Sequence, residues 1–428
     1  MRGHSRGEET GPVNFGGKAS EAMQTQSQSE APSATPPEVF VQVSPRIERL
    51  RVLHVVSRLG TGGTEHGILK VISGLGEEDF EHRICAVRGT DTEFVNRMNA
   101  AVRTYTVASA RPGLQFPLFR LARVMKEFRP HIVHTRNFGS LEAIPAARMA
   151  RVPVAIHSEH GYELETLGGL PLRRRLFCGG CYAMADAVFT VTRDLRDYHS
   201  RQSWRSAHKF RLIHNGVNTE RFFPCPERSR QIRQELGIPA GRVVIGSVGR
   251  LVPIKDHGTL LRAAENLVRR GKDVHVLIVG SGPELAKLQT SAQASASLAG
   301  RVTFPGESDR VAELLNAMDV FVLTSICEGM SNTILEAMAS GLPAVVTRAG
   351  GNPELVEEGR SGWLFPPRDT EALEQHLLRL IDDTELRQQV GAAARVQVCE
   401  HFSLEGMIQR YRDLYLELAA RRGLRKGD

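Results

Sequence analysis

Short runs of β-branched and other apolar residues recur along this chain from about residue 51, and each run is followed by a turn and an amphipathic stretch. The runs lie at 52–56, 132–134, 154–156 and 188–191, and then at 243–249, 274–280, 302–304, 320–323 and 344–346. Strands that alternate with helices predict a parallel sheet with helices on both faces. Because the series restarts, we expect an α/β fold with two doubly wound, Rossmann-like domains that face each other across a cleft.

The restart also indicates how the 428 residues divide, since this length suits two domains. The expected parts are a disordered tail (1–47), an N-terminal domain (48–215), a C-terminal domain (216–400) and a final helix that returns to the first domain (401–428). The tail is rich in Gly, Ser, Pro and Gln and can bury too little apolar surface to fold. A turn-rich stretch with Pro224 and Pro226 is predicted to link the domains.

The composition is that of an ordinary globular protein, with 41% hydrophobic and 24% charged residues. No stretch reaches the ~18 consecutive apolar residues of a membrane-spanning helix, and no apolar signal segment is evident. We therefore expect a cytoplasmic protein, with the inner membrane surface as a peripheral alternative. The net charge of +7 comes from scattered basic residues, which disfavours nucleic acid as a partner. Six cysteines suggest no disulfide framework, and the Cys178–Cys181 pair is interpreted as helix packing rather than half of a metal site.

A glycine-rich turn follows the first predicted strand and opens a helix, with the sequence Gly60-Thr61-Gly62-Gly63-Thr64-Glu65. Glycines there allow backbone N–H groups to approach an anion, and the helix N-terminus adds partial positive charge. The spacing differs from the G-x-G-x-x-G pattern of dinucleotide-binding proteins, which argues against an oxidoreductase. A tight turn without a ligand remains the alternative.

Two basic residues, Arg250 and Lys255, lie between the strand at 243–249 and the next helix. At a strand end they can converge on one point, where two cations suit a diphosphate group. The alternative is that both are simply solvated.

The loop after the strand at 320–323 carries the strongest pattern. Glu328 lies in the loop, and Glu336 lies about one turn inside a helix that is predicted to begin near Ser331 or Asn332. Carboxylates suit the vicinal hydroxyl groups of sugars and ribose. The N–H groups of 329–332 would point from the helix N-terminus towards an anion. A surface carboxylate is the alternative for Glu336, but its neighbours Ala337, Met338 and Ala339 indicate burial.

From Leu50 to the C-terminus the chain resembles family 4 of the glycosyltransferases. The motifs that carry the resemblance are G-G-x-E at 62–65, G-R-L-x-x-x-K at 249–255, G-S-G-P-E at 280–284 and E-G-x6-E at 328–336. The resemblance implies a GT-B fold and a retaining hexosyltransferase that uses a nucleotide sugar, UDP- or GDP-linked, and a saccharide or lipid-linked acceptor. The segments Ser331–Asn332 and 157–161 are similar to sugar transferases of exopolysaccharide systems associated with exosortase (PEP-CTERM).

The resemblance also implies roles for individual residues. Gly62 and Gly63 would approach the donor, and Arg250 and Lys255 would hold its diphosphate. The sugar hydroxyls would be bound by Glu328, with the backbone of Gly329, Met330, Ser331 and Asn332 on the sugar and phosphate. The ribose would be bound by Glu336, and His160 would lie beside the reacting centre. The catalytic group expected from the resemblance is therefore His160, Arg250, Lys255 and Glu328, although a lone histidine is more often structural than catalytic.

The chain contains no D-x-D triplet, so no metal or other cofactor is expected, and the two cations would stabilise the leaving group. No carboxylate is an evident nucleophile, which favours front-face attack over a covalent intermediate. A nucleotide-sugar epimerase or hydrolase of the same fold and a non-catalytic nucleotide-sugar-binding module remain alternatives. The segment 168–177, with three arginines among apolar residues, suits an anionic membrane near a lipid-linked acceptor, and a solvated helix start explains it equally well.

Overall fold

The computed structural model describes residues 49–60, 62–98, 102–107, 117–162, 171–201 and 206–424. The expected tail at 1–47 lies outside these residues, as do Thr61 of the glycine-rich turn and residues 168–170 of the arginine-rich segment. All described residues belong to one unit, 46–428.

The first half of this unit is built on a seven-stranded parallel sheet with the order β3-β2-β1-β4-β5-β6-β7. Its strands are β1 (Leu50–Val56), β2 (Phe80–Ala86), β3 (Thr104–Thr106), β4 (Ile132–Arg136), β5 (Val154–Glu159), β6 (Ala187–Thr190) and β7 (Phe210–Leu212). Successive strands start from β1 and extend in both directions, which places a topological switch point between β1 and β4. In such sheets ligands bind beyond the carboxyl ends of the strands at the switch point.

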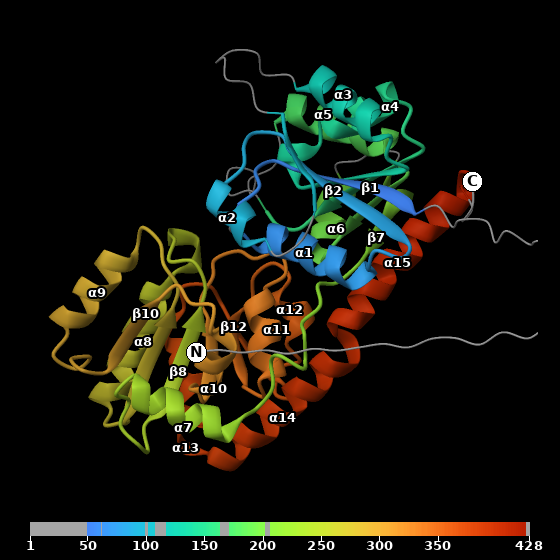
Figure 1. The fold of residues 1–428 in the computed structure, drawn as a ribbon. Coiled ribbons are helices and arrows are strands. Elements are labelled where there is room, and N and C mark those ends of the chain that lie inside the picture. Colours follow the sequence, from blue (N-terminus) through green and yellow to red (C-terminus); the bar gives the residue numbers. More distant parts are fainter. Residues whose placement is uncertain are drawn as a thin grey trace, which may run out of the picture. The chain divides into compact units, whose positions relative to one another are not determined.

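Helices cover both faces of this sheet. They are α1 (Gly63–Leu75), α2 (Thr92–Arg97), α3 (Leu118–Phe128), α4 (Ala143–Met149), α5 (Leu172–Met184) and α6 (Arg193–Ser200). Side chains alternate along each strand, so Leu53 packs with α3, α4 and α5 while Val52 packs with α1 and the C-terminal helix α15 (Leu404–Arg421). Figure 1 shows α3, α4 and α5 together on one side of the sheet and α15 beside α1.

The second half repeats the plan with a six-stranded parallel sheet of order β10-β9-β8-β11-β12-β13. Its strands are β8 (Val243–Val248), β9 (Val274–Val279), β10 (Val302–Gly306), β11 (Val320–Leu323), β12 (Ala344–Thr347) and β13 (Gly362–Phe365). The switch point lies between β8 and β11. The expected α/β fold with two Rossmann-like doubly wound sheets is therefore confirmed.

Further helices surround the second sheet, and α14 (Thr384–His401) packs beside α11 and α13. The others are α7 (Pro226–Glu235), α8 (His257–Arg269), α9 (Leu285–Ala294), α10 (Val311–Asn316), α11 (Asn332–Ala339), α12 (Asn352–Leu355) and α13 (Thr370–Asp382). One apolar cluster packs α7, α10 and α11 on one face, and another packs α8 and α13 on the other. Every helix of the described residues is too short or too polar to span a bilayer.

The chain crosses between the two sheets twice, and the crossings lie side by side. Val217 of the first crossing donates its N–H to the Phe402 carbonyl at 2.9 Å and accepts from the Leu404 N–H at 2.9 Å. Gly216 lies so close to the second crossing that an added Cβ would come within 2.6 Å of the Ser403 carbonyl oxygen. Only glycine fits this approach without a backbone shift, which explains its position in the crossing.

Two details differ from the expectation. Pro226, which was assigned to the linker, is the first residue of α7, where its missing N–H costs nothing and its fixed φ suits a helix. The final helix, expected over 401–428, is α15 (Leu404–Arg421); it follows α14 (Thr384–His401), and Ser403 caps it through the Gly406 N–H.

Candidate functional site

A cavity of about 410 Å³ lies at the carboxyl ends of both sheets, beside the two switch points. Its walls come from the loop and helix after β1, the ends of β4 and β5, the loop after β8, the loop after β11, and α15. The described residues that line it and that the sequence singled out are Gly63, His160, Arg250, Lys255, Glu328, Gly329, Met330, Ser331 and Asn332. The cavity therefore gathers segments that are far apart in the chain, from Gly63 of α1 to Tyr411 of α15.

The loop after β8 brings a charged pair into the cavity. The Lys255 ammonium group forms an ion pair with the Glu328 carboxylate from the loop after β11, and both side chains are largely buried. Arg250 is exposed to solvent at the cavity wall. The cavity therefore contains two cations, Lys255 and Arg250. The Glu328 carboxylate holds the Lys255 side chain in place, and it also lines the cavity, where it can accept hydrogen bonds from hydroxyl groups.

The loop after β11 is packed closely against the first half of the protein. An added Cβ at Gly329 would come within 2.2 Å of the His160 carbonyl oxygen, so this position tolerates only glycine without rearrangement. The Asn332 side chain accepts a hydrogen bond from the Asn215 amide at 3.0 Å. The Met330 sulfur accepts from the Asn215 N–H at 3.1 Å. These contacts place the N-terminus of α11, with its unpaired N–H groups, at the cavity wall.

His160 closes the cavity from the first half. Its ring Nε2 lies 2.9 Å from the Ser158 hydroxyl, and its backbone N–H donates to the Asn137 side chain at 2.8 Å. Burial, with a smaller contribution from the charge of Arg136, lowers the pKa of His160 to about 3. The imidazole is therefore neutral at pH 7 and serves as a hydrogen-bonding group rather than as a cation.

Two of the expected site residues do not line the cavity. Glu336 lies on α11 behind the lining residues, where burial raises the pKa of its carboxyl group against the charges of Lys70 and Arg221. Glu336 lies about one turn along α11 from Asn332 and Thr333, which do line the cavity. Gly62 caps α1, and the Glu65 carboxylate folds back over it, 2.4 Å from where a Cβ would stand.

Several residues that sequence reasoning missed also line the cavity. The described ones are Thr64, Gly67, Lys70, Arg136, Gly161, Tyr162, Asn215, Gly216, Val248, Gly249, Ile254, Cys327, Thr333, Met407 and Tyr411. Gly67 and Lys70 could have been found, because they lie about one and two turns after the glycine-rich loop on the same helix. Arg136 could also have been found as the residue that ends β4 at the switch point. No comparable sequence pattern pointed to Met407 and Tyr411 of α15, because their position at the cavity depends on where the chain crosses back to the first sheet.

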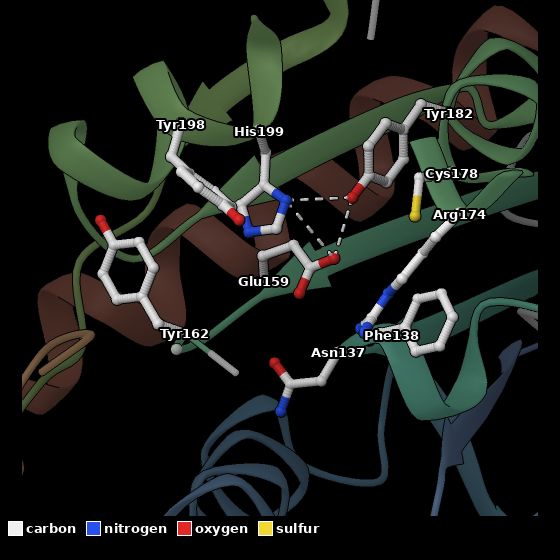
Figure 2. Close-up of a pocket in the computed structure, with 10 residues that line it drawn as sticks. Asn137, Phe138, Glu159, Tyr162, Arg174, Cys178, Tyr182, Tyr198 and His199 are labelled. Carbon is white, nitrogen blue, oxygen red and sulfur yellow. Dashed lines mark hydrogen bonds and ion pairs between the residues drawn. The ribbon is translucent and has the colours of Figure 1, made fainter. Parts of the chain in front are cut away.

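A smaller cavity of about 180 Å³ adjoins the first and shares Gly161 and Tyr162 with it. In Figure 2 the rings of Tyr162 and Tyr198 lie to the left of the Glu159 carboxylate and those of Phe138 and Tyr182 to its right. Glu159 accepts from the Tyr182 hydroxyl at 3.0 Å. Although burial opposes ionisation, His199 and His157 lower the pKa of Glu159 to about 2. This cavity is thus an aromatic chamber with an ionised carboxylate in its wall.

The described residues contain no group of three or more histidine, cysteine or acidic side chains arranged to hold a metal ion. Cys178 and Cys181 are buried in α5, and burial raises the pKa of the Cys181 thiol to about 12. Their side chains belong to the apolar cluster under α3, α4 and α5.

Two family models match the chain. Residues 61–221 match the model described as Glycosyltransferase Family 4, and residues 228–397 match the model described as Glycosyl transferases group 1. Each half of the unit, with its own sheet, is therefore recognised separately.

Similar proteins are known in bacteria. The chain is 26% identical over 385 residues to UDP-Gal:alpha-D-GlcNAc-diphosphoundecaprenol alpha-1,3-galactosyltransferase of Escherichia coli, covering 86% of this chain and 97% of that one. It is 31% identical over 345 residues to GDP-mannose-dependent alpha-(1-6)-phosphatidylinositol monomannoside mannosyltransferase of Mycolicibacterium smegmatis, covering 76% and 87%. The fold is similar to the crystal structure of Anabaena Alr3699/HepE in complex with UDP, with a TM-score of 0.75, 20% identity, and coverage of 86% and 100%. The two matching models and this level of identity show that the chain belongs to the family 4 glycosyltransferases, a retaining family that uses nucleotide sugars.

Proposed function

We propose that this protein transfers a hexose with retention from a UDP- or GDP-sugar to a saccharide or lipid-linked acceptor in exopolysaccharide or other cell-surface glycan synthesis. The observation that supports this most strongly is the convergence of Arg250, Lys255 and Glu328 in one cavity at two switch points. In this proposal the cations bind the diphosphate, Glu328 binds sugar hydroxyls and Glu336 binds the ribose. The similarity of Ser331–Asn332 and 157–161 to exosortase-associated transferases supports the narrower setting of such an exopolysaccharide system.

The proposed reaction uses front-face attack. Glu328 is the one carboxylate among the described lining residues, and its ion pair with Lys255 makes it a poor nucleophile. The bond from the anomeric carbon to the phosphate oxygen breaks, and a bond from the same carbon to the acceptor oxygen forms on the same face. The acceptor's proton passes to the departing phosphate, whose charge Arg250 and Lys255 stabilise. No metal is required, because these two side chains supply the positive charge.

The relatives support the choice of substrates. The solved Anabaena protein holds UDP, and the printed name of the Escherichia coli relative gives a UDP-sugar donor and an acceptor linked through diphosphoundecaprenol. We propose that the smaller cavity takes the acceptor sugar, because aromatic rings and a carboxylate are the groups that bind a pyranose ring and its hydroxyls.

A panel of donors tests the proposal. We expect one of UDP-, GDP- or ADP-glucose at 100 times its Kd to stabilise the protein by about 2.7 kcal/mol, seen as a raised Tm. Turnover with that donor and an acceptor extract should persist in EDTA. No stabilisation by any nucleotide sugar would overturn the proposal. Product from donor alone would favour an epimerase or hydrolase, and binding without any turnover would favour a binding module.

We further propose that α3 and α5 contact an anionic membrane. Phe119 is 74% exposed and Leu172 is 67% exposed, and Arg173 and Arg175 lie beside Leu172 on α5. An Arg173→Gln/Arg175→Gln variant should lose most of its binding to vesicles that contain anionic lipid, whereas wild type should bind them less as salt rises. Arg174 is left intact because it stacks on Phe138.

The matched control for the vesicle experiment is Arg228→Gln/Arg230→Gln, which removes the same charge from α7 in the second half. If wild type and the Arg173→Gln/Arg175→Gln variant bind the vesicles equally in a co-sedimentation assay, the membrane proposal is wrong and the arginines are simply solvated at the start of α5.

A further inference from the structure

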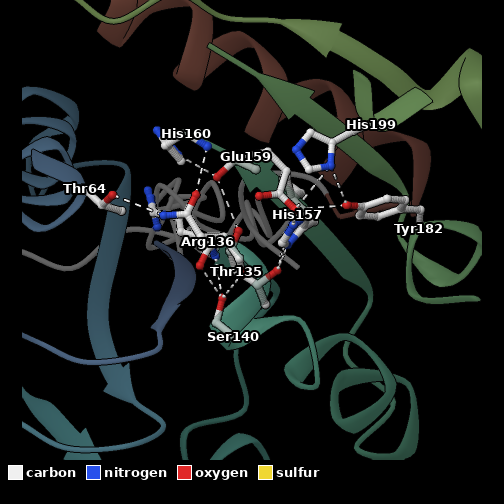
Figure 3. A network of polar contacts seen from close by, with 12 residues as sticks. Thr64, Thr135, Arg136, Ser140, His157, Glu159, His160, Tyr182 and His199 are labelled. Atoms are coloured by element: carbon white, nitrogen blue, oxygen red, sulfur yellow. Dashed lines mark hydrogen bonds and ion pairs between the residues drawn. The ribbon is translucent and has the colours of Figure 1, made fainter. Parts of the chain in front are cut away.

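Arg136 is a buried cation that the proposed reaction does not use. It is the last residue of β4, and only 2% of its surface is exposed. The Ser140 hydroxyl fixes its backbone, accepting from the Arg136 N–H at 2.8 Å and donating to its carbonyl at 2.7 Å (Figure 3). Its Nη1 atom donates to His54 Nδ1 at 3.0 Å. Its Nη2 atom is buried and makes no hydrogen bond to any described residue.

The groups around the Arg136 guanidinium do not neutralise it. Burial first, and then the charge of Arg136, lowers the pKa of His54, of His134 and of His160, so all three rings are neutral at pH 7. Tyr411 and Tyr415 of α15 present hydroxyl groups whose pKa values are raised by burial, so they too are uncharged. A buried charge that lacks a partner is strongly unfavourable, so native proteins pair such charges with a counter-ion.

The charge of Arg136 affects the pKa of one acidic residue, Glu65, although the two side chains do not form an ion pair. Burial raises the pKa of Glu65, and the charges of Arg136 and Arg250 both act against this rise. No ion pair between Glu65 and Arg136 forms within 4.0 Å in the described residues. Glu65 instead lies over Gly62. Since both arginines act on Glu65, they approach one region from opposite halves of the protein.

Arg136 also lines the larger cavity, together with Lys70, Arg250 and Lys255. Of these four cations, Lys255 is paired with Glu328. Because Nη1 is bound to His54, Nη2 is the guanidinium nitrogen left without a hydrogen bond, and at a cavity wall it is suited to an oxygen of a phosphate group. The ligand should therefore bring its own negative charge to the first half of the cavity.

We propose that Arg136 is a binding residue for a substrate phosphate, in a subsite formed by the first half of the cavity. The proposal rests on the proposed function, because that function supplies two sources of phosphate. The donor carries a diphosphate, and a lipid-linked acceptor carries a phosphate or diphosphate of its own. The chemistry recognised by Arg136 is the same for both.

Calorimetric titration of wild type and Arg136→Gln with pyrophosphate, UDP and inorganic phosphate tests the subsite, with the phosphate added to UDP-saturated protein. We expect Arg136→Gln to bind pyrophosphate at least tenfold more weakly. A matching loss for UDP would identify the donor diphosphate as the ligand. Unchanged UDP affinity with loss of phosphate binding to the UDP-saturated protein would identify the acceptor phosphate. Affinities within twofold of wild type for all three probes would overturn the proposal.

Two further variants complete the experiment. Arg88→Gln removes the same charge from the same edge of the sheet but outside the cavity lining, and its affinities should stay within twofold of wild type. Arg136→Lys keeps the charge but cannot bond His54 and a phosphate oxygen with separate planar N–H groups, and we expect a folded protein with at least threefold weaker pyrophosphate binding. If Arg136→Gln does not fold, unchanged binding by Arg136→Lys overturns the proposal. If UDP fails to bind wild type, the UDP donor is wrong, while the pyrophosphate titration still tests Arg136.

Discussion

Lys255→Ala is expected to lower kcat/KM for sugar transfer by about a thousandfold while leaving the fold intact. Lys255 is proposed to stabilise the charge that develops on the departing diphosphate, and removing one such preorganised donor costs about 10²–10³ in rate. The substitution also leaves the Glu328 carboxylate without its partner in a cavity that must admit an anion. Steady-state kinetics with the donor found by the stabilisation screen, alongside circular dichroism, measures the effect.

Two companions separate the roles of this pair. Lys272→Ala removes a lysine that pairs with Asp382 on the exposed surface, and its kinetics should match wild type. The double variant Lys255→Ala/Glu328→Gln removes both charges, and we expect no recovery, because Glu328 also binds the sugar. Recovery to wild-type rates would mean that Lys255 only neutralises Glu328. Lys255→Ala activity above a tenth of wild type would remove Lys255 from the proposed site.

Acid is expected to unfold this protein steeply below about pH 6. Seven histidines of the described residues have a pKa lowered by burial in the folded state, to about 4 for His82, His257 and His275, to about 3 for His160, to well below the usual value for His54 and His134, and below it for His376. Their unfolded pKa is about 6.5. Between the folded and unfolded values the unfolded chain binds more protons, so stability is complete above pH 6.5 and is lost as the pH falls.

The expected size of the acid effect is several kcal/mol. Each such histidine contributes up to about 1.4 kcal/mol per pH unit, whereas whole domains are stable by only about 5–15 kcal/mol. Glu65, Glu142 and Glu336 act in the opposite direction, because burial raises their pKa values and the folded state then binds protons first. These three glutamates are fewer than the histidines, so we still expect the free energy of unfolding to fall as the pH falls.

Urea unfolding at pH 7.5, 6.0 and 5.0 measures this dependence. His275→Gln is the matched variant, because His275 lies outside the cavity lining and bonds only Thr303 at 2.9 Å among the described residues. It should flatten the slope by about 1.4 kcal/mol per pH unit. Equal unfolding free energies at pH 7.5 and 5.0 would show that the histidines are protonated in the folded state.

Nine of the thirteen strands in the described part of the chain were predictable from sequence, because a strand buried on both faces is a continuous apolar run. The four that were missed are β2, β3, β7 and β13. Three of these lie at sheet edges, where one side has no neighbouring strand, and β3 and β7 have only three residues. In β2 the polar residues Glu81 and Arg83 interrupt the apolar pattern because they face the less buried side. Such strands are defined by the neighbour they pair with, which no local pattern records.

The chemical groups of the larger cavity were also predictable in part. Glu328, Arg250 and Lys255 follow strands directly, and in a parallel sheet the residues after neighbouring strands meet at one edge. The ion pair between Lys255 and Glu328 was not predictable, since it depends on the adjacency of β8 and β11 in the sheet order. For Glu336 the motif predicted only the spacing from Glu328 along the chain. Whether the Glu336 side chain lines the cavity depends on the residues packed around α11, which a motif does not record.

Local sequence alone determined that this chain forms two doubly wound sheets with glycine-rich, basic and acidic loops at their carboxyl ends, because periodicity and turn chemistry act over a few residues. Only the tertiary structure decided which of these loops share a cavity and that Arg136 is buried without a counter-charge. Those properties depend on contacts between segments far apart in the chain, where burial rather than residue type sets the cost of a charge.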